Sequence, residues 1–302
     1  MVRLNHEQGA PEATCYLNGD YLPLSQARIS PLDRGFLYAD GVYEVMPVFA
    51  RRPFRLDAHL DRLQHSLAGI RLPNPHCREA WKEIVRRLVD EAPWADQSLY
   101  LQVTRGADDK RSMPFPPEVQ PTVFAFVAPL VQPSAQQRER GIGAVTVNDI
   151  RWGRCDLKTL VLLPNVLAHQ SAVDAGCEEA VLIRDGYLSE GASSNIFVVK
   201  DGVILAPPKD HRMLPGTTYD VVLELAVRHE ARHEIRAIAE AELRSADELW
   251  RTSSSKGVLA ITTLDGRPVG HGEQAGKPGP VMRQMQTWYA AFFDEYMSEA
   301  QP

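Results

Sequence analysis

Three dipeptides of the Asn-Gly and Asp-Gly type, each between short runs of apolar and β-branched residues, constrain the fold of this chain most. Asn18-Gly19 interrupts residues 14–24, and Asp185-Gly186 and Asp201-Gly202 divide residues 178–208. Such dipeptides readily adopt the positive φ angles that two-residue turns between antiparallel strands require. The pattern predicts one hairpin at 14–24 and three successive strands at 178–208, with residues 187–200 as a single strand.

Helical periodicity follows the first hairpin. At 57–70 the apolar side chains recur on one helical face, and Asp57 stands where it could cap the helix. The residues on that face are Leu60, Leu63, Leu67 and Ile70. We predict further helices at 77–91, 164–175, 217–231, 240–246 and 278–297, and further strands at 42–49, 53–56, 98–105, 121–128, 143–152 and 248–253.

The mixture of strands and helices in a chain of 302 residues predicts an α/β protein with two domains. We expect an N-terminal domain at 1–128, an interdomain linker at 129–140 and a C-terminal domain at 141–302. Residues 105–120 are polar and rich in proline, and they are too many for a hairpin turn. This segment is therefore predicted to be a functional loop.

Charge and composition limit the classes of partner. The net charge of -6 argues against binding to a nucleic acid, since proteins of that class usually carry a basic face. The N-terminal residues lack the apolar core of a signal peptide, and no apolar run is long enough to span a membrane. These features predict a cytoplasmic protein without a membrane partner. The four cysteines are widely spaced, so we expect reduced and mostly buried thiols rather than disulfides or a zinc knuckle.

Lys158 raises the question of function, because it lies among the apolar residues Leu157, Leu160, Val161, Leu162 and Leu163. One interpretation is that its aliphatic stem covers apolar surface while the ammonium stays in water. The other is that loss of water favours the neutral amine, a nucleophile able to form a Schiff base. Nothing within this stretch decides between the two.

The sequence His229-Glu230-Ala231-Arg232-His233 matches the H-E-x-x-H pattern of zinc enzymes. On a helix this spacing places two imidazoles over one zinc ion. Here the pattern ends a predicted helix among several arginines, which indicates a solvated face, and no third ligand is signalled downstream. We therefore predict no metal site.

Three further polar clusters follow Lys158 in a defined order. Glu190 precedes the small residues Gly191 to Asn195, and a carboxylate there could pair with a pyridine nitrogen or lie in a solvated turn. Residues 214–218, Leu-Pro-Gly-Thr-Thr, open a helix whose Thr217 and Thr218 could cap it or bind a phosphate. Residues 250–255 end a predicted strand with hydroxyls, among them that of Ser254, and could bind a phosphate or form an ordinary polar turn. Each cluster is a weak signal alone, but their order is distinctive.

In these residues the chain resembles the class IV, fold-type IV aminotransferases, which use pyridoxal 5'-phosphate, and it looks closest to the D-amino acid transaminases among them. The resemblance runs from about Cys15 to Tyr289. Its most specific segments are 33–45, 59–63, 100–106, 149–158, 190–197 and 214–218. It implies a smaller N-terminal α/β domain and a larger C-terminal domain with a barrel-like sheet.

The resemblance also implies a role for each residue of the site. Lys158 would hold the cofactor as a Schiff base, the internal aldimine, and would then move the proton at the substrate α-carbon. Glu190 would pair with the pyridine nitrogen and Leu214 would pack on the ring face. Phosphate ligands would be Arg62, Thr217, Thr218 and Ser254, and the substrate pocket would include Tyr43 and Val45.

The chain departs from the family pattern at the loop that binds the substrate carboxylate. D-specific members carry an R-x-H pair there, on a loop contributed across the dimer interface. In this chain Arg111 matches the arginine, whereas Met113 stands in place of the histidine. Arg111 could bind a carboxylate alone or lie in solvent. Pro47, Tyr219 and Lys256 are further departures, the first bearing on the substrate and the other two on the phosphate.

The resemblance therefore implies a homodimeric transaminase that moves the amino group of a D-amino acid, of the D-alanine or D-glutamate type, to a 2-oxo acid. Met113 keeps an (R)-selective amine transaminase open as an alternative. A branched-chain L-amino acid transaminase and an aminodeoxychorismate-type lyase would share the cofactor residues. A non-catalytic metabolite-binding protein is the fourth alternative.

Overall fold

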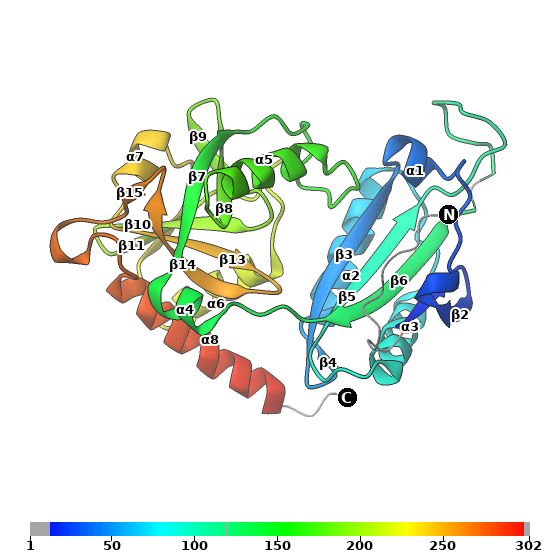
Figure 1. Cartoon of the computed structure of the whole chain (residues 1–302), viewed down its shortest axis with the longest axis horizontal. Coiled ribbons are helices and arrows are strands. Elements are labelled where there is room, and N and C mark those ends of the chain that lie inside the picture. Colours follow the sequence, from blue (N-terminus) through cyan, green and yellow to red (C-terminus); the bar gives the residue numbers. More distant parts are fainter. Residues whose placement is uncertain (1–12, 119, 299–302) are drawn as a thin grey trace. The chain divides into compact units, whose positions relative to one another are not determined.

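The computed structural model describes residues 13–118 and 120–298. By its internal contacts the chain divides into two compact units. The first contains the residues up to Leu130 together with Lys158–Leu160, and the second contains Val131–Leu157 and the residues from Val161 onward. Each unit is built on its own β-sheet (Figure 1).

The first unit is an antiparallel sheet with two long helices. Its strands follow the order β2-β1-β6-β5-β3-β4. The elements are β1 (Thr14–Leu17), β2 (Asp20–Pro23), η1 (Leu24–Gln26), α1 (Arg34–Tyr38), β3 (Gly41–Phe49), β4 (Arg52–Pro53), α2 (Leu56–Gly69), α3 (Arg78–Glu91), β5 (Gln97–Thr104) and β6 (Thr122–Pro129). The predicted hairpin at 14–24 is confirmed, because Leu17 pairs with Asp20 around Asn18 and Gly19, which both have positive φ.

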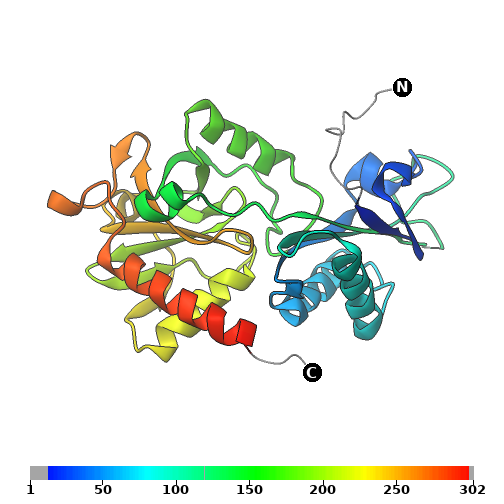
Figure 2. The ribbon, with the colours of Figure 1, turned by 60° about the horizontal axis from the view of Figure 1, so that its bottom comes forward.

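Helices α2 and α3 cover the same face of this sheet (Figure 2). On α2 the predicted apolar face is confirmed, since Leu60, Leu63 and Leu67 are buried against strand residues such as Val42 and Met46. Burial of these side chains is the main stabilising contribution in this unit.

The predicted cap of α2 is wrong. The helix begins at Leu56 with Arg55 at the N-cap, so Asp57 lies in the first turn. Its carboxylate accepts hydrogen bonds from Arg78 at 2.9 Å and Lys82 at 3.1 Å on α3. Asp57 thus pairs with the neighbouring helix and does not cap its own. Its negative charge in the first turn still interacts favourably with the helix dipole.

The second unit is built on a mixed sheet with the strand order β12-β11-β10-β13-β14-β7-β8-β9, to which β15 adds beside β14. Its elements are α4 (Ala135–Arg140), β7 (Ile142–Asn148), α5 (Leu163–Asp174), β8 (Glu179–Arg184), β9 (Tyr187–Gly191), β10 (Asn195–Lys200), β11 (Val203–Ala206), α6 (Thr217–Arg228), β12 (His233–Ile235), α7 (Glu240–Arg244), β13 (Glu248–Ser253), β14 (Gly257–Leu264), β15 (Arg267–Pro268), η2 (Gly272–Gln274) and α8 (Pro280–Ser298). The predicted α/β fold with a barrel-like sheet is confirmed, since this sheet curls into a half-barrel.

The prediction of one strand at 187–200 is wrong. The chain turns between Gly191 and Asn195, so β9 pairs with β8 while β10 pairs with β13. Glu179 holds the turn, because its carboxylate accepts hydrogen bonds from the Ala192 amide at 3.1 Å and the Ser194 hydroxyl at 2.7 Å. Strands β12, β14 and β15 were not predicted at all. No Asn-Gly or Asp-Gly dipeptide precedes β12 or β14. The Asp265-Gly266 dipeptide lies between β14 and β15, but the prediction did not use it.

Helices α5, α6, α7 and α8 agree closely with those predicted, whereas α4 lies within the expected linker at 129–140 and was not predicted. Helices α6 and α8 pack against each other and against the sheet, and α5 packs against β7 and β8. Beneath α6, the rings of Phe197, Tyr219 and Trp250 are fully buried and in contact. The hydroxyl of Tyr219 donates to the carbonyl of Pro207 at 2.7 Å. Tyr219 is therefore a core residue in this structure.

Among the helices that the structure describes, none has the length and apolar character needed to cross a bilayer. All four cysteines have free thiols. Cys15 and Cys155 are buried, as expected, whereas Cys77 is exposed and Cys177 is partly exposed.

Candidate active site

Lys158 is held by its main chain against β3. Its amide donates to the hydroxyl of Ser66 at 3.0 Å, and its carbonyl accepts from the Tyr43 amide at 3.0 Å. Two residues on, the Leu160 amide donates to the Gly41 carbonyl at 3.1 Å. Residues 158–160 therefore extend along the edge of the first sheet, which is why they group with the first unit although the expected domain boundary at 141 places them in the second.

The surroundings of the Lys158 side chain are less apolar than the sequence indicates. Leu157 is buried, but Val161 and Leu163 are 38% and 68% exposed. The ammonium lies 4.3 Å from the ring centroid of Tyr43. The ring of Tyr43, rather than the run of leucines, therefore lies beside the amine. The face of such a ring can stabilise a cation.

Tyr43 and Val45 point to the sheet face that α2 and α3 leave uncovered. Alternation along β3 requires this, because Val42, Glu44 and Met46 face the helices. The Tyr43 ring stacks on Tyr100 with a centroid distance of 5.8 Å. This strand thus presents the two predicted pocket residues on one face and buries a carboxylate on the other.

The buried carboxylate is Glu44, a residue that the sequence analysis missed. Arg62 donates from Nε and Nη2 to its two oxygens, both at 2.8 Å, and His59 Nδ1 lies 2.8 Å from Oε2. Burial alone would raise the pKa of Glu44, but the Arg62 guanidinium and the hydrogen bonds from Arg62 and His59 hold it well below its usual range. Burial lowers the pKa of His59, so its neutral ring donates Nδ1–H to the carboxylate.

Arg62 therefore has its guanidinium plane fixed by Glu44. A bidentate arginine–carboxylate pair is both strong and directional. The Nε2 atom of His59 is buried and has no hydrogen-bond partner among the described residues. The alternation of β3 could have revealed Glu44, since a charged residue between Val42 and Met46 on a buried face must have partners.

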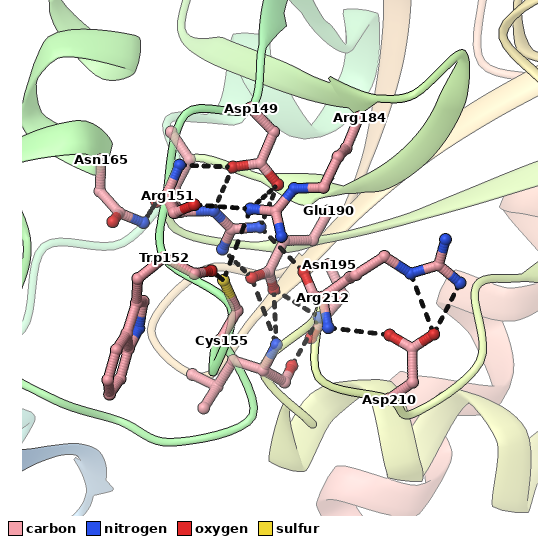
Figure 3. A network of polar contacts seen from close by, with 12 residues as sticks. Asp149, Arg151, Trp152, Cys155, Asn165, Arg184, Glu190, Asn195, Asp210 and Arg212 are labelled. Carbon is pink, nitrogen blue, oxygen red and sulfur yellow. Dashed lines mark hydrogen bonds and ion pairs between the residues drawn. The ribbon is translucent and has the colours of Figure 1, made fainter.

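In the second unit, Glu190 lies at the end of β9 in a network of polar contacts (Figure 3). Its carboxylate accepts from Asn195 Nδ2 at 3.1 Å, from the Leu214 amide at 3.2 Å and from Nη1 of Arg151. Glu190 is only 4% exposed. The position predicted to meet a pyridine nitrogen is therefore a buried carboxylate held from three sides.

Arg151 is itself fixed by Asp149. Its Nε and Nη2 each lie 2.9 Å from an oxygen of Asp149, and Arg184 lies 3.0 Å from the same carboxylate (Figure 3). Burial alone would raise the pKa of Asp149, but the hydrogen bonds and charge of Arg151 lower it to about 2. Neither Asp149 nor Arg151 was singled out from the sequence, although both belong to the segment 149–158.

The start of α6 provides hydroxyls and free amides. Gly216 is the N-cap, and a Cβ there would lie 2.2 Å from Oδ1 of Asn195, so the close approach requires glycine. The Thr217 hydroxyl lies 2.9 Å from that of Ser254. Thr218 is 2% exposed, and its hydroxyl has no partner among the described residues. A buried, unpaired hydroxyl at a helix N-terminus suits a phosphate oxygen.

The loop between β5 and β6 carries Arg111 and Met113. Arg111 is exposed, and its guanidinium lies 5.4 Å from the ring centroid of Tyr38. The Met113 side chain is 66% exposed. The structure thus places both residues on the surface of the first unit.

The H-E-x-x-H pattern does not lie on a helix. Helix α6 ends at Arg228, Glu230 has a positive φ of 53°, and His233 begins β12. His229 instead stacks on Trp288 with a centroid distance of 4.4 Å. The two imidazoles are thus used separately, and the described residues contain no group of three His, Cys, Asp or Glu that could hold a metal ion.

Comparison with known proteins identifies the family. The family model described as amino-transferase class IV matches residues 41–264. The chain belongs to the class IV aminotransferases. Members of this family depend on pyridoxal 5'-phosphate, so the chain is a pyridoxal-phosphate-dependent aminotransferase.

Individual relatives cover nearly the whole chain. It is 37% identical to a D-alanine aminotransferase from Bacillus licheniformis over 89% of this chain and 93% of the relative. Identity to a D-alanine aminotransferase from Staphylococcus aureus is 36%, over 93% and 98% of the two chains. A fold IV transaminase from Curtobacterium pusillum superposes with a TM-score of 0.78 at 26% identity, covering 95% of this chain and all of that one. The branched-chain aminotransferase of Escherichia coli gives 0.87 at 24% identity, a likeness of fold.

A pH dependence of stability follows from Asp149. Its pKa is lowered on folding, so its contribution is fully present above the unfolded value near 3.8 and is lost as the pH falls to about 2. We expect the free energy of urea unfolding of cofactor-free protein to differ between wild type and Asp149→Asn by a constant amount above pH 4. Below pH 4 the difference should shrink by about 2 kcal/mol.

The exposed Asp294 provides the control, since Asp294→Asn should leave the pH profile of the wild type unchanged. A difference between wild type and Asp149→Asn that stays constant down to pH 2 would contradict the ion pair as the source of this stability.

Proposed function

We propose that this aminotransferase transfers the amino group of a D-amino acid, of the D-alanine or D-glutamate type, to a 2-oxo acid. The observation that carries the proposal is the similarity to D-alanine aminotransferases, at 34–37% identity over most of both chains. The likeness to branched-chain enzymes in the solved structures is weaker in sequence, at 22–25% identity. A D-amino acid is therefore the substrate class that the comparisons favour.

The residues present suit pyridoxal 5'-phosphate. When bound, this cofactor supplies an aldehyde that captures an amino group and a pyridine ring that accepts the electrons of the substrate α-carbon. The chain offers an amine at Lys158, a buried carboxylate at Glu190, and the unpaired hydroxyl of Thr218 beside the amides of α6. These are the three chemical groups that the aldehyde, the ring nitrogen and the phosphate require.

We propose that Lys158 is the catalytic residue. Its Nζ would hold the cofactor covalently in the resting enzyme and, once released, would carry the proton to and from the substrate α-carbon. The main-chain bonds to Ser66 and Tyr43 fix the start of this side chain, which limits the positions that Nζ can reach.

Glu190 would hold the ring nitrogen. Arg151, Asn195 and the Leu214 amide fix its carboxylate, which leaves its orientation independent of the ligand. The phosphate would be bound by Thr217, Thr218 and Ser254, with charge from Arg62, and Leu214 would pack on the ring. Three observations support these phosphate ligands: the helix N-terminus, the Thr217–Ser254 contact and the fixed guanidinium plane of Arg62.

Tyr43 and Val45 would line the substrate pocket, and Arg111 would take the substrate carboxylate. Met113 brings no hydrogen-bond donor, and its side chain is 66% exposed. This departure from the D-specific pattern favours the (R)-selective amine transaminase as the second candidate, because amines without a carboxylate do not need that donor.

We propose that the enzyme works as a homodimer. Each unit by itself exposes large apolar side chains, among them Phe36 on α1 at 79%, and Leu163 and Val166 on α5 at 68% and 60%. Apolar surface of this kind is usually covered in an assembly.

Cytoplasmic localisation stays a prediction from the N-terminal sequence.

The assembly is testable by light scattering. We expect the purified protein to elute with twice the 33.7 kDa mass of the chain. A mass of one chain at micromolar concentration would contradict the dimer.

The substrate class is tested by a panel of half-reactions, in which the absorbance of the bound cofactor is followed after addition of D-alanine, D-glutamate, L-leucine or (R)-1-phenylethylamine. We expect reaction with the D-amino acids and recovery of the absorbance on adding 2-oxoglutarate or pyruvate.

Other outcomes separate the alternatives. Reaction with (R)-1-phenylethylamine alone indicates the amine transaminase, and reaction with L-leucine alone indicates the branched-chain enzyme. Release of pyruvate from aminodeoxychorismate without any 2-oxo acid indicates the lyase, and a colourless protein unaffected by borohydride indicates a non-catalytic binding protein.

A further inference from the structure

Two buried arginines of the first unit share one carboxylate beside the loop that carries Arg111. Nε of Arg34 and Nε of Arg105 both lie 2.8 Å from Oδ2 of Asp40. The side chains of the two arginines are 4% and 1% exposed. We call these three residues the Asp40 clamp. Two buried cations on one anion leave positive charge that further acceptors must satisfy.

Arg34 finds those acceptors in the loop itself. Its Nη1 donates to the carbonyls of Ser112 at 2.5 Å and Pro114 at 3.3 Å, and its Nη2 donates to the carbonyl of Met113 at 3.0 Å. Three successive carbonyls of an irregular segment are thus bound by one guanidinium. The backbone of a loop outside sheets and helices normally forms its hydrogen bonds with water. Here the Arg34 guanidinium binds the carbonyls instead, and this contact restricts the movement of residues 112–114.

Arg105 also contacts this loop. Its guanidinium lies 3.6 Å from the ring centroid of Phe115, close enough for a strong cation–π contact. Its Nη1 and Nη2 donate to the carbonyls of Arg71 and Ile70, just beyond the end of α2. The loop is therefore tied to the helix that also carries Arg62.

Arg111 directly precedes the three bound carbonyls. Its guanidinium lies 5.4 Å from the ring centroid of Tyr38, and that of Arg34 lies 4.9 Å from the same ring. Tyr38 and Arg34 are the last and first residues of α1. Helix α1 thus supplies both the guanidinium of Arg34, which binds the loop backbone, and the ring of Tyr38, beside which Arg111 lies.

We propose that Arg34 is a positioning residue for substrate recognition: by binding the carbonyls of Ser112, Met113 and Pro114, it presents Arg111 to the substrate carboxylate in one orientation. This inference rests on the proposed role of Arg111. The contact is made with the main-chain carbonyl of Met113, whose side chain is exposed, so it does not depend on the identity of that side chain.

The test compares Arg34→Lys with wild type in the half-reaction with D-alanine. Lysine keeps the charge but loses the planar fork that binds three carbonyls. We expect the D-alanine concentration for half-maximal rate to rise at least about tenfold, since a displacement of roughly 1 Å can cost up to about a hundredfold. The rate at saturating D-alanine should change by less than about twofold, because a weakened substrate contact raises the half-maximal concentration and leaves the maximal rate unchanged. The absorbance of the bound cofactor before substrate is added should match that of wild type.

A second readout does not depend on activity. Lys110 and Arg111 are exposed trypsin sites within the loop. We expect cleavage there, identified by the masses of the fragments, to be several-fold faster in Arg34→Lys than in wild type. Arg138→Lys is the matched control, because Arg138 also donates to a main-chain carbonyl but belongs to α4 in the second unit and binds no carbonyl of this loop. Phe115→Ala, a change at a 46% exposed side chain, should act in the same direction through Arg105.

Equal D-alanine dependence and equal cleavage in wild type, Arg34→Lys and Phe115→Ala would overturn the proposal. Loss of the rate at saturating D-alanine together with loss of bound cofactor in Arg34→Lys would also overturn it, because Arg34 would then support the fold rather than the loop. Failure of wild type to react with D-alanine would instead contradict the proposed substrate class.

Discussion

The site of this aminotransferase depends on a short length of main chain that joins the edge of a sheet. Residues 158–160 bond to β3 through the Tyr43 and Leu160 amides, and Ser66 on α2 accepts from the Lys158 amide. A reactive amine on a free loop would sample many positions, and the cost in rate would be large. Here Lys158, the proposed nucleophile, starts from a backbone as constrained as a strand, and Tyr43 contributes both a backbone bond and an aromatic face beside the ammonium.

Buried ion pairs then orient the charged residues in each unit. Glu44 fixes Arg62 in the first unit, and Asp149 fixes Arg151, which holds Glu190, in the second. Replacing a whole buried pair by apolar residues often costs little, since desolvation offsets most of the attraction, whereas loss of one partner leaves an uncompensated charge. Their value lies in geometry, because a carboxylate or guanidinium that is bonded on several sides keeps its direction when a ligand arrives. The Asp40 clamp uses the same principle to hold a loop backbone.

Local signals explain why most of the fold was predictable. Asn18-Gly19 specifies its hairpin through positive φ angles, and the apolar face of α2 follows from helical spacing. The division of 187–200 into two strands was not predictable, since Glu179, which holds the turn, lies outside that stretch. The proposed roles of Lys158, Glu190 and the residues assigned to the phosphate came from the resemblance, because the sequence patterns alone left each of them ambiguous.

The partners of the site residues were harder to predict, because they are far apart in sequence. Glu44 meets Arg62 across a strand and a helix, and Asp40 meets Arg105 where the neighbouring strands β3 and β5 are paired. No periodicity connects such positions. Alternation along β3 does mark Glu44 as a buried charge, so the sequence indicates that a partner exists without naming it.

Covalent attachment at Lys158 is the claim on which the functional account rests, and peptide mass spectrometry tests it most directly. The protein as purified is reduced with borohydride, digested, and its peptides are weighed. The account predicts a single pyridoxyl adduct, located on the peptide that contains Lys158 and missing from Lys158→Ala. An adduct on another lysine, or none on any peptide of a cofactor-loaded sample, would contradict it.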